Sequence, residues 1–450
     1  MESFYNVILS RAPPNPKWRQ TRVGILALRL PKGKIAMGLR SAEMGRNKKY
    51  AGYKAYQYLE PGVDHKEFNL RAGVVTDWWH PVPLTKSEEE RFEQLMERNI
   101  VVSLHEHPSL YPKDIKYSPE VFPEGRQFLA HEALSRSGLD CVFDNLMDGR
   151  AVVNTKHGWD WNSTIHDLGM KLCDIAHQDF IVHCRRVQDI RDAHEDGRLA
   201  WVAVLESSSC IENEVDRVDV LYGLGVRSMG ICYSESNMLG SGLKERGDGG
   251  LTDFGYDAVV RMNKLGMLID VSHTGDKTAL DTIELSSRPI VISHAGARAL
   301  MPTRRMFPDE VLQALAERDG VIGVEVAGFG ARSDEHPEGG IEGFMDHVEY
   351  CIDLMGIDHV GIGPDSLYGD HVAHYAVFHE KYRTGGYGQY RRPGAEAERE
   401  YHPIEYVEGM ENPTECLQNV TRWLIKHGYT DREISKIIGV NAINLLEKVW

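Results

Sequence analysis

The chain has 450 residues, of which 42% are hydrophobic, and a formal net charge of −16. The acidic surplus disfavours nucleic acids and anionic membrane surfaces as partners, although ordinary solubility explains the same balance. The length is enough for a large core with one appendage and does not by itself demand two domains, because a single α/β barrel takes about 250 residues, and more with insertions.

No targeting signal is recognisable at either end of the sequence. Residues 1–20 lack a basic stretch followed by an apolar one, and no uninterrupted apolar run approaches the roughly 18 residues of a membrane span. The seven cysteines are odd in number and form no CxxC pair, as is typical of reduced, buried thiols. We therefore expect a cytoplasmic protein with neither a signal peptide nor a membrane segment.

Residues 1–85 differ from the rest of the chain. They are rich in Lys, Arg, Tyr, Gly and Pro and show no alternation of strands and helices. Two apolar runs within residues 22–40 flank the sequence PKGK and predict a small hairpin. We predict an N-terminal extension here, either a small β-containing subdomain or an irregular arm that packs on the main domain or on a partner subunit.

From residue 86 onward, short apolar strands alternate with amphipathic helices. The first helix is expected at 87–99, with Ser87 as its N-cap. Strands are predicted at 99–105, 141–147, 180–184, 199–207, 225–234, 267–273, 289–295, 321–328 and 359–366. Helices are predicted at 163–178, 187–197, 215–225, 254–266, 277–286, 309–320, 344–356, 412–428 and 431–449. Repeated strand–helix units predict a parallel sheet, and about eight of them favour closure into a (β/α)8 TIM-type barrel over residues 86–450.

Two further features bear on the fold. The first strand is not followed by GxGxxG, which argues against a dinucleotide-binding fold. A long stretch at 369–408 is rich in His and Tyr and poor in aliphatic residues. It begins just after the last predicted strand, so we predict a loop at the catalytic face, either a functional lid or a solvated insertion.

Residue types that bind metals stand at the ends of several predicted strands. The carboxyl ends of the strands meet at one face of such a barrel, and chemistry takes place there. Imidazoles and carboxylates are the ligands that zinc and similar metals prefer. The sequence therefore predicts a metal centre. Its candidate residues are His105, His107, Glu206, His273, His294 and Asp365.

The first two of these residues form an HxH pair. Alternate residues of a strand face the same side, so we expect His105 and His107 to point into the barrel mouth and Glu106 to point away from it. Such a pair is a good chelate for zinc. Glu206 ends a strongly apolar strand, where a carboxylate is costly to bury unless it binds a metal or forms a salt bridge.

The later strands contribute a second pair and an acid. His273 and His294 each follow a predicted strand as part of Ser-His, in successive strand–helix units, which indicates metal ligands rather than core histidines. Asp365 ends the last strand, where its carboxylate can accept a proton from water and pass it to the leaving group. A metal would lower the pKa of that water towards ~7 and polarise the scissile carbonyl.

Several stretches resemble the membrane (renal) dipeptidases, a branch of the amidohydrolase superfamily. The resemblance covers about residues 100–450 and does not extend to residues 1–85. It implies a (β/α)8 barrel that holds two zinc ions, one on His105 and position 107 and the other on His273 and His294, with Glu206 bridging them. The matching stretches are 250–273, 289–300, 306–324, 359–366 and 407–446.

The resemblance also implies roles for two other residues and an assembly. Asp365 matches the catalytic aspartate, and Arg305 matches the arginine that binds the substrate carboxylate, for which its guanidinium is well suited. A surface ion pair is the alternative for Arg305. The family further suggests a homodimer or a higher homo-oligomer, with the N-terminal segment as a candidate interface.

This chain departs from the family pattern at two positions. The family has an aspartate where His107 stands, and the exchange removes a negative charge from a site for two dications. We therefore expect one or two zinc ions, or another divalent metal. The family has a substrate-binding histidine where Tyr233 stands, within a residue or so. The Tyr233 hydroxyl can still donate to an oxyanion, but it carries no positive charge.

Together these features predict a metal-dependent hydrolase. We expect it to cleave an amide bond in a small carboxylate-bearing substrate, with dipeptides as the default. The alternative is the same metal centre acting on a specialised non-peptide metabolite, by other hydrolysis or by decarboxylase or lyase chemistry. A non-catalytic binding protein is disfavoured, because every position of the constellation carries a functional residue type.

Overall fold

The computed structural model describes residues 49–71, 80–146, 148–151, 159–326, 331–369, 374, 377 and 408–450. Residues Ala42–Trp450 belong to one compact unit. The hairpin predicted within residues 22–40 lies outside the described residues, as does nearly all of the loop predicted at 369–408.

Parallel strands form a curled sheet at the centre of this unit. The strands are β1 Val102–Leu110, β2 Cys141–Asn145, β3 Ile181–His183, β4 Leu199–Leu205, β5 Val226–Gly230, β6 Leu268–Asp270, β7 Val291–Ala295, β8 Val321–Val324, β9 Val360–Ile362 and β10 Ser366–Tyr368. Their order is β10-β1-β2-β4-β5-β6-β7-β8-β9, and β3 pairs with the start of β4.

The sheet closes through a broken strand. Only residues 363–365 separate β9 from β10, while β9 pairs with β8 and β10 pairs with β1. The two pieces therefore act as a single barrel strand that joins both ends of the sheet. With β3 as an addition beside β4, eight barrel strands remain among the described residues. This arrangement confirms the predicted α/β fold of the (β/α)8 TIM type.

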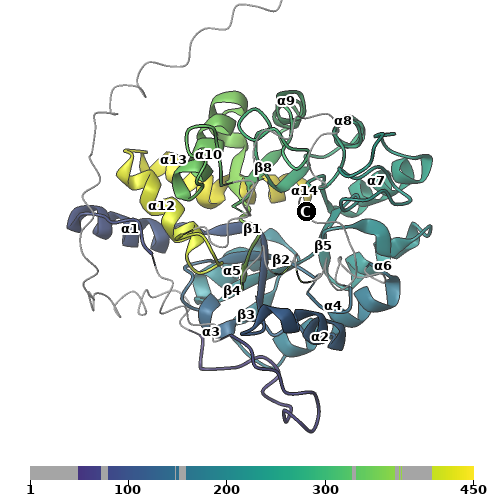
Figure 1. Cartoon of the computed structure of the whole chain (residues 1–450), viewed down its shortest axis with the longest axis horizontal. Helices are drawn as coiled ribbons and strands as arrows, with labels where there is room; N and C mark the ends of the chain where they lie inside the picture. Colours follow the sequence, from purple (N-terminus) through teal and green to yellow (C-terminus); the bar gives the residue numbers. More distant parts are fainter. Residues whose placement is uncertain are drawn as a thin grey trace, which may run out of the picture. The chain divides into compact units, whose positions relative to one another are not determined.

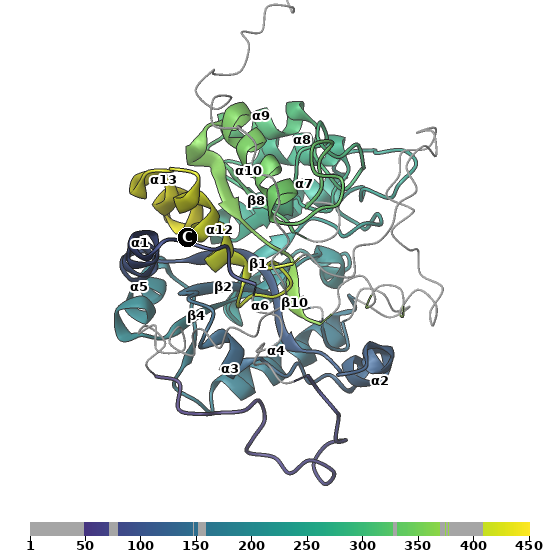
Figure 2. The same cartoon turned by 60° about the vertical axis from the view of Figure 1, so that its left-hand side comes forward.

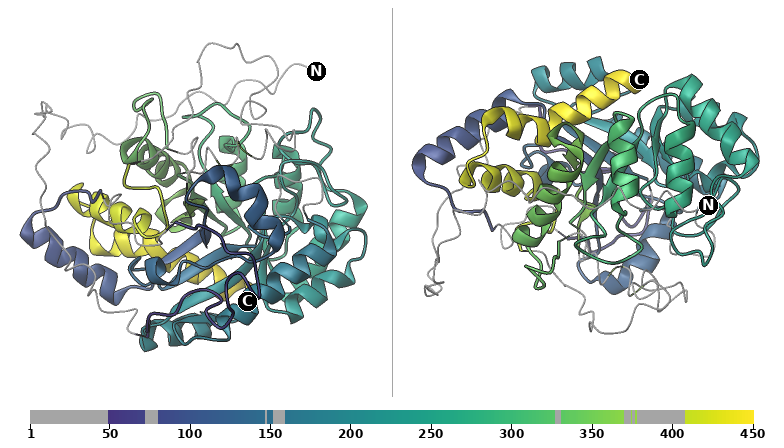
Figure 3. Two further views of the ribbon diagram at one scale, coloured as in Figure 1. Left: turned by 60° about the horizontal axis from the view of Figure 1, so that its bottom comes forward. Right: turned by 90° about the horizontal axis from the view of Figure 1, so that it is seen from above.

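Helices surround the strands, as Figures 1 and 3 show. They are α1 Lys86–Arg98, α2 Ser118–Val121, α3 His131–Leu134, α4 Trp161–Ile175, α5 Val187–Asp196, α6 Asp216–Gly223, α7 Asp253–Leu265, α8 Asp276–Leu285, α9 Asp309–Glu317, α10 Ile341–Met355, α12 Cys416–Lys426, α13 Asp431–Ser435 and α14 Asn441–Val449. In the described ranges, no helix is long and apolar enough to cross a membrane.

The start of α1 differs from the prediction. Thr85, and not Ser87, caps this helix, because the Thr85 side chain accepts a hydrogen bond from the backbone of Glu88. The Glu88 carboxylate in turn accepts from the Thr85 backbone, which completes a capping box. Figure 2 shows α1 beside α12, where the Arg422 guanidinium contacts the carboxylate of Glu89.

Apolar side chains fill the barrel below the catalytic face. Leu446 of α14 shares a buried cluster with Val102, Val291 and Val321, which are the first residues of β1, β7 and β8. Helix α14 therefore packs against the amino ends of the strands. The opposite, carboxyl ends are left for polar side chains, as in other barrels of this type.

The described part of the predicted extension packs on the barrel unit. Asp174 of α4 is fully buried, and its Oδ1 accepts hydrogen bonds from the Tyr53 hydroxyl at 2.7 Å and the Tyr56 backbone at 2.6 Å. His131 Nε2 lies 3.0 Å from the other oxygen of Asp174. Residues 49–71 thus belong to the same packed body, and the domain boundary near residue 85 stays a prediction.

Candidate metal centre

A bulge in β1 sets the direction of its two histidines. Between Ser103 and Glu106, β1 advances three residues while its partner β2 advances two. The extra residue changes which side chains of β1 face into the barrel, and His105 and His107 both point towards the barrel mouth. Glu106 points the other way, where the hydroxyls of Ser103 and Ser366 donate to its carboxylate at 3.0 and 2.7 Å.

Three side chains from β4, β6 and β7 converge on one point, and we call this group the β6–β7 half. Glu206 Oε1 lies 2.7 Å from His273 Nε2 and 3.0 Å from His294 Nε2. The two Nε2 atoms are themselves 3.0 Å apart. Burial lowers the pKa of both histidines well below its usual value, so both imidazoles are neutral.

The β6–β7 half fits a divalent metal. Two neutral imidazole nitrogens and a carboxylate oxygen are a ligand set that zinc binds readily. Oxygen Oε2 of Glu206 is buried and has no hydrogen-bond partner in the described part of the chain. Both the convergence of ligand atoms and this unsatisfied carboxylate oxygen are explained by a bound cation.

The β1 half lies next to it and consists of His105, His107 and Asp365. Asp365 Oδ1 lies 3.1 Å from His107 Nε2 and 3.6 Å from His105 Nε2. His105 Nε2 is also 3.9 Å from Glu206 Oε1, so Glu206 lies between the halves. The ligand atoms of His105, His107 and Glu206 all lie within 4.8 Å of one another, which makes a second metal position geometrically possible.

His107 differs from His273 and His294 in the direction of its pKa shift. Burial opposes a charged imidazole, but the carboxylates of Asp148 and Asp365 outweigh burial and raise the pKa of His107 well above its usual value. His107 Nδ1 lies 3.5 Å from Asp148 Oδ2. A metal that binds here must therefore displace a proton, whereas the β6–β7 half presents neutral imidazoles.

A hydrogen-bonded group behind the ligands holds their rings. The Ser293 hydroxyl contacts His105 Nδ1 at 3.2 Å and His294 Nδ1 at 2.8 Å, and it donates to Asp270 Oδ2 at 2.5 Å. Bonds to Nδ1 leave Nε2 facing the centre, as outer partners do in metal sites. Our sequence reasoning missed Ser293 and Asp270, although the repeated Ser-His at the strand ends contained the signal.

Tyr233 lies directly beside a candidate ligand. Its ring stacks on His273 with 4.1 Å between centroids and 24° between planes. Trp159 lies on another side of Tyr233, at 6.0 Å between centroids. Tyr233 therefore forms part of the wall of the centre, where its phenol is close to any group bound at His273.

Arg305 is buried, and it lies close enough to the centre for its charge to act on Glu206, His273 and His294. Its Nη1 donates to the Ser272 carbonyl at 3.1 Å, and its Nη2 forms an ion pair with Glu325, the residue after β8. Burial raises the pKa of Glu325 to about 8, and the Arg305 guanidinium opposes that shift. Sequence reasoning missed Glu325, because nothing but its position after an apolar strand marks it.

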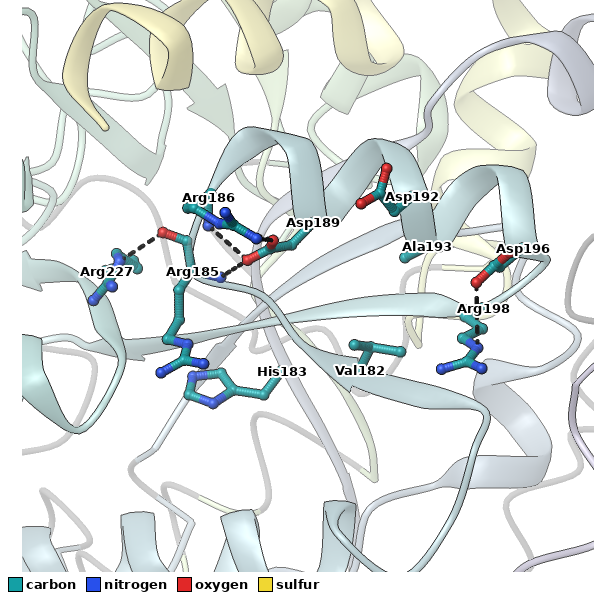
Figure 4. Close-up of a pocket in the computed structure, with 10 residues that line it drawn as sticks. All are labelled: Val182, His183, Arg185, Arg186, Asp189, Asp192, Ala193, Asp196, Arg198 and Arg227. Carbon is teal, nitrogen blue, oxygen red and sulfur yellow. Dashed lines mark hydrogen bonds and ion pairs between the residues drawn. The ribbon is translucent and has the colours of Figure 1, made fainter.

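A cavity of about 490 Å³ lies elsewhere, between β3, α5 and the start of β5 (Figure 4). Among its lining residues, Arg186 forms an ion pair with Asp189 at 2.6 Å, and the Arg227 guanidinium donates to the Arg185 carbonyl at 2.8 Å. None of the candidate ligands lines this cavity. The carboxyl ends of the strands therefore remain the candidate active site.

The fold and this centre define a metal-dependent hydrolase of the α/β-barrel type. More narrowly, the chain belongs to the membrane dipeptidase family, peptidase family M19, whose model matches residues 166–374. An uncharacterised protein in the pqqA 5′ region of Klebsiella pneumoniae is 34% identical over 190 residues, which are 40% of this chain and 70% of that protein. These matches confirm the family that the sequence motifs predicted.

Named relatives and solved structures agree with this assignment. Dipeptidase tcpJ of Claviceps purpurea is 24% identical over 285 residues, 63% of this chain and 58% of that protein. The crystal structure of an amidohydrolase from Pseudomonas aeruginosa has a TM-score of 0.62 at 25% identity and covers 80% of this chain and 99% of its own. A metallopeptidase of the same family, dipeptidase AC, has a TM-score of 0.53 at 25% identity and covers 64% of this chain and 76% of its own.

Proposed function

We propose that this protein hydrolyses an amide bond in a small carboxylate-bearing substrate, with dipeptides as the first class to test. The observation that carries the proposal is the meeting of Glu206, His273 and His294 within about 3 Å, beside Asp365. When bound there, a divalent metal such as zinc supplies Lewis acidity for a carbonyl and lowers the pKa of water. Family membership supports the same reaction class.

Different residues of the centre would hold the two metal ions. Glu206, His273 and His294 would hold one ion. The two imidazoles need lose no proton to do so, whereas burial and the Asp365 carboxylate raise the pKa of Glu206, so its carboxyl group would release a proton when the ion binds. His105 and His107, with Glu206 between the halves, would hold a second, weaker one. We therefore propose one or two metal ions for each chain.

Asp365 is proposed as the general base and then the general acid. Its Oδ1 lies 3.1 Å from His107 Nε2 and 3.6 Å from His105 Nε2, and these contacts restrict the orientation of the carboxylate. From that position it would accept the proton of the attacking water and later deliver it to the leaving amine. A positioned carboxylate of this kind contributes roughly 10²–10⁴-fold to the rate.

Two other side chains are proposed to contact the substrate. Arg305 would bind the carboxylate of the substrate, since a guanidinium offers parallel donors to two oxygens. The Tyr233 hydroxyl would donate to the oxyanion that develops on the attacked carbonyl. We further propose that the protein works as a homodimer or a higher homo-oligomer, which light scattering of the purified protein would test.

A second candidate function keeps the centre and changes the substrate. The stacked Tyr233 on His273 supports it, because a phenol cannot supply the charge of a substrate-binding imidazole. In that case a non-peptide metabolite would be hydrolysed, or would undergo decarboxylase or lyase chemistry.

One experiment separates these possibilities. Purified protein is loaded with zinc, its metal content is measured, and a panel of dipeptides and N-acyl amino acids is assayed. We expect one to two metal ions for each chain and turnover of at least one dipeptide. Metal-replete protein that cleaves nothing in the panel would support the second function, and failure to bind metal after reconstitution would contradict both.

A further inference from the structure

In this structure Arg305 already forms an ion pair with the carboxylate of Glu325. Glu325 is only 1% exposed and Arg305 only 4%, so water does not weaken their ion pair as it weakens surface pairs. One guanidinium nitrogen contacts the Glu325 carboxylate, and another donates to the Ser272 carbonyl. The guanidinium is thus held from two sides by groups of the protein itself.

This ion pair faces the metal centre. Ser272 directly precedes the ligand candidate His273, so the bond from Arg305 to the Ser272 carbonyl places the guanidinium against the backbone of the centre. The charge of Arg305 also acts on His273, His294 and Glu206. A substrate carboxylate that reaches Arg305 from the centre therefore meets a guanidinium whose Nη2 is already taken by an acid.

Two carboxylates that share one guanidinium compete for its donors. They also repel each other, and the repulsion is stronger in a buried site than in water. The competition disappears when Glu325 becomes neutral and keeps its shape. The competition for Arg305 affects only ligands that contain a carboxylate.

We propose that Glu325 is an internal competitor for Arg305 and sets how strongly the enzyme prefers substrates with a free carboxylate. This inference rests on the proposed function, because it takes Arg305 as the binding group for that carboxylate. Glu325 acts through Arg305 and is a specificity-determining residue, not a catalytic one. Replacing Glu325 should therefore change the KM and leave the kcat unchanged.

The test is run above pH 8, where the Glu325 carboxylate is ionised, and compares alanyl-alanine with alanyl-alaninamide, which differ only in a carboxylate or a carboxamide at the end. In Glu325→Gln we expect the KM for alanyl-alanine to fall about tenfold, the lower end for one charge-assisted hydrogen bond. The kcat for both compounds and the KM for the amide should stay within about twofold of wild type. An unchanged or higher KM for alanyl-alanine in the folded variant would overturn the inference.

Binding measurements separate this inference from the proposed function. Phosphinate mimics of the same two compounds are titrated into zinc-loaded protein by calorimetry, so no turnover is needed. Wild-type protein that cleaves nothing in the panel of dipeptides and N-acyl amino acids contradicts the proposed function, while tighter binding of the acid mimic to Glu325→Gln still supports the competitor. Failure of both mimics to bind either form overturns the inference, since it denies a carboxylate site at Arg305.

Two further variants control for misfolding and for the loss of an acid at an unrelated ion pair. If Glu325→Gln does not fold, as judged by circular dichroism, Glu325→Asp is used: it keeps the charge but withdraws the carboxylate by one methylene, and it should lower the KM for alanyl-alanine by a smaller factor. Asp276→Asn is the matched control, because it removes the acid from the neighbouring Arg298 ion pair, with contacts of 2.5 and 2.7 Å. The same KM change in this control would overturn the inference.

Discussion

The β6–β7 half and the β1 half of the metal centre lie side by side but differ in charge. In the first, burial keeps His273 and His294 neutral, and their Nε2 atoms converge with one oxygen of Glu206. In the second, His107 lies between the carboxylates of Asp148 and Asp365, which favour its charged form.

This difference separates two ways of stabilising a buried polar cluster. The carboxylates and the imidazolium of the β1 half compensate one another without any ligand. The β6–β7 half has two neutral imidazoles and a carboxylate whose Oε2 lacks a hydrogen-bond partner among the described residues. We therefore expect the first metal ion to bind tightly to the β6–β7 half and the second to bind weakly to the β1 half.

The largest expected effect comes from removing a ligand of the tight half. His294→Ala should weaken metal binding by more than the roughly 10–100-fold that loss of an outer partner costs, and should abolish turnover. His107→Ala should leave one tightly bound ion in place. Elemental analysis after dialysis and calorimetric titration measure both. An equal loss of bound metal in the two variants would show that the two halves do not differ in metal affinity.

The next effect tests the role of Asp365. Asp365→Asn keeps the shape of the side chain and removes its ability to accept a proton, so kcat should fall by roughly 10²–10⁴-fold. Metal content in the β6–β7 half should remain that of wild type. Full activity in Asp365→Asn would contradict its role as general base.

A smaller effect is expected behind the ligands. Ser293→Ala removes the hydroxyl that contacts His105 and His294 and that donates to Asp270. Metal affinity should fall by roughly 10–100-fold, because the rings lose their fixed orientation. Ser272→Ala is the comparison variant, because the Ser272 hydroxyl also donates to Asp270, at 2.5 Å to Oδ1, whereas the contacts to the imidazole Nδ1 atoms come from Ser293. A metal affinity equal to wild type in Ser293→Ala would deny that the outer hydroxyl positions the rings.

The smallest effect concerns pH. A histidine with a raised pKa holds its proton to higher pH, so metal binding near His107 must displace that proton and should weaken by about tenfold for each pH unit of acidification. The pKa values of His273 and His294 are lowered, so these residues stay neutral over the same range, and the raised pKa of Glu206, which both positions share, does not change the order in which the ions are lost. Metal content measured between pH 8 and pH 6 should therefore fall from two ions towards one. Simultaneous loss of both ions would contradict this order.

Much of the fold was predictable from the sequence because strand ends in a barrel converge whatever their exact length. An error of one or two residues at the end of β6 or β7 still leaves His273 and His294 at the same face. The same tolerance explains why Thr85 was missed as the cap of α1 while the helix itself was found. Local rules decide that an element exists, and side-chain competition decides its exact end.

The remainder of the centre depends on contacts between distant segments. Asp148 meets His107, and Glu325 meets Arg305, only after the barrel has closed. The bulge in β1 also depends on its partner strand and leaves no mark in the sequence of β1 itself. These features determine charge and specificity, so the sequence indicated the class of chemistry better than the choice of substrate.

The break between β9 and β10 affects the thermal stability of the protein. Asp365 lies at this break with φ = 56°, in the left-handed region that costs a residue with a side chain about 1–2 kcal/mol and glycine almost nothing. Asp365→Gly should therefore melt at a higher temperature than Asp365→Ala, because both variants lose the carboxylate and only alanine keeps the cost of the left-handed backbone. The backbone at this position thus restricts which replacements of the residue the fold tolerates.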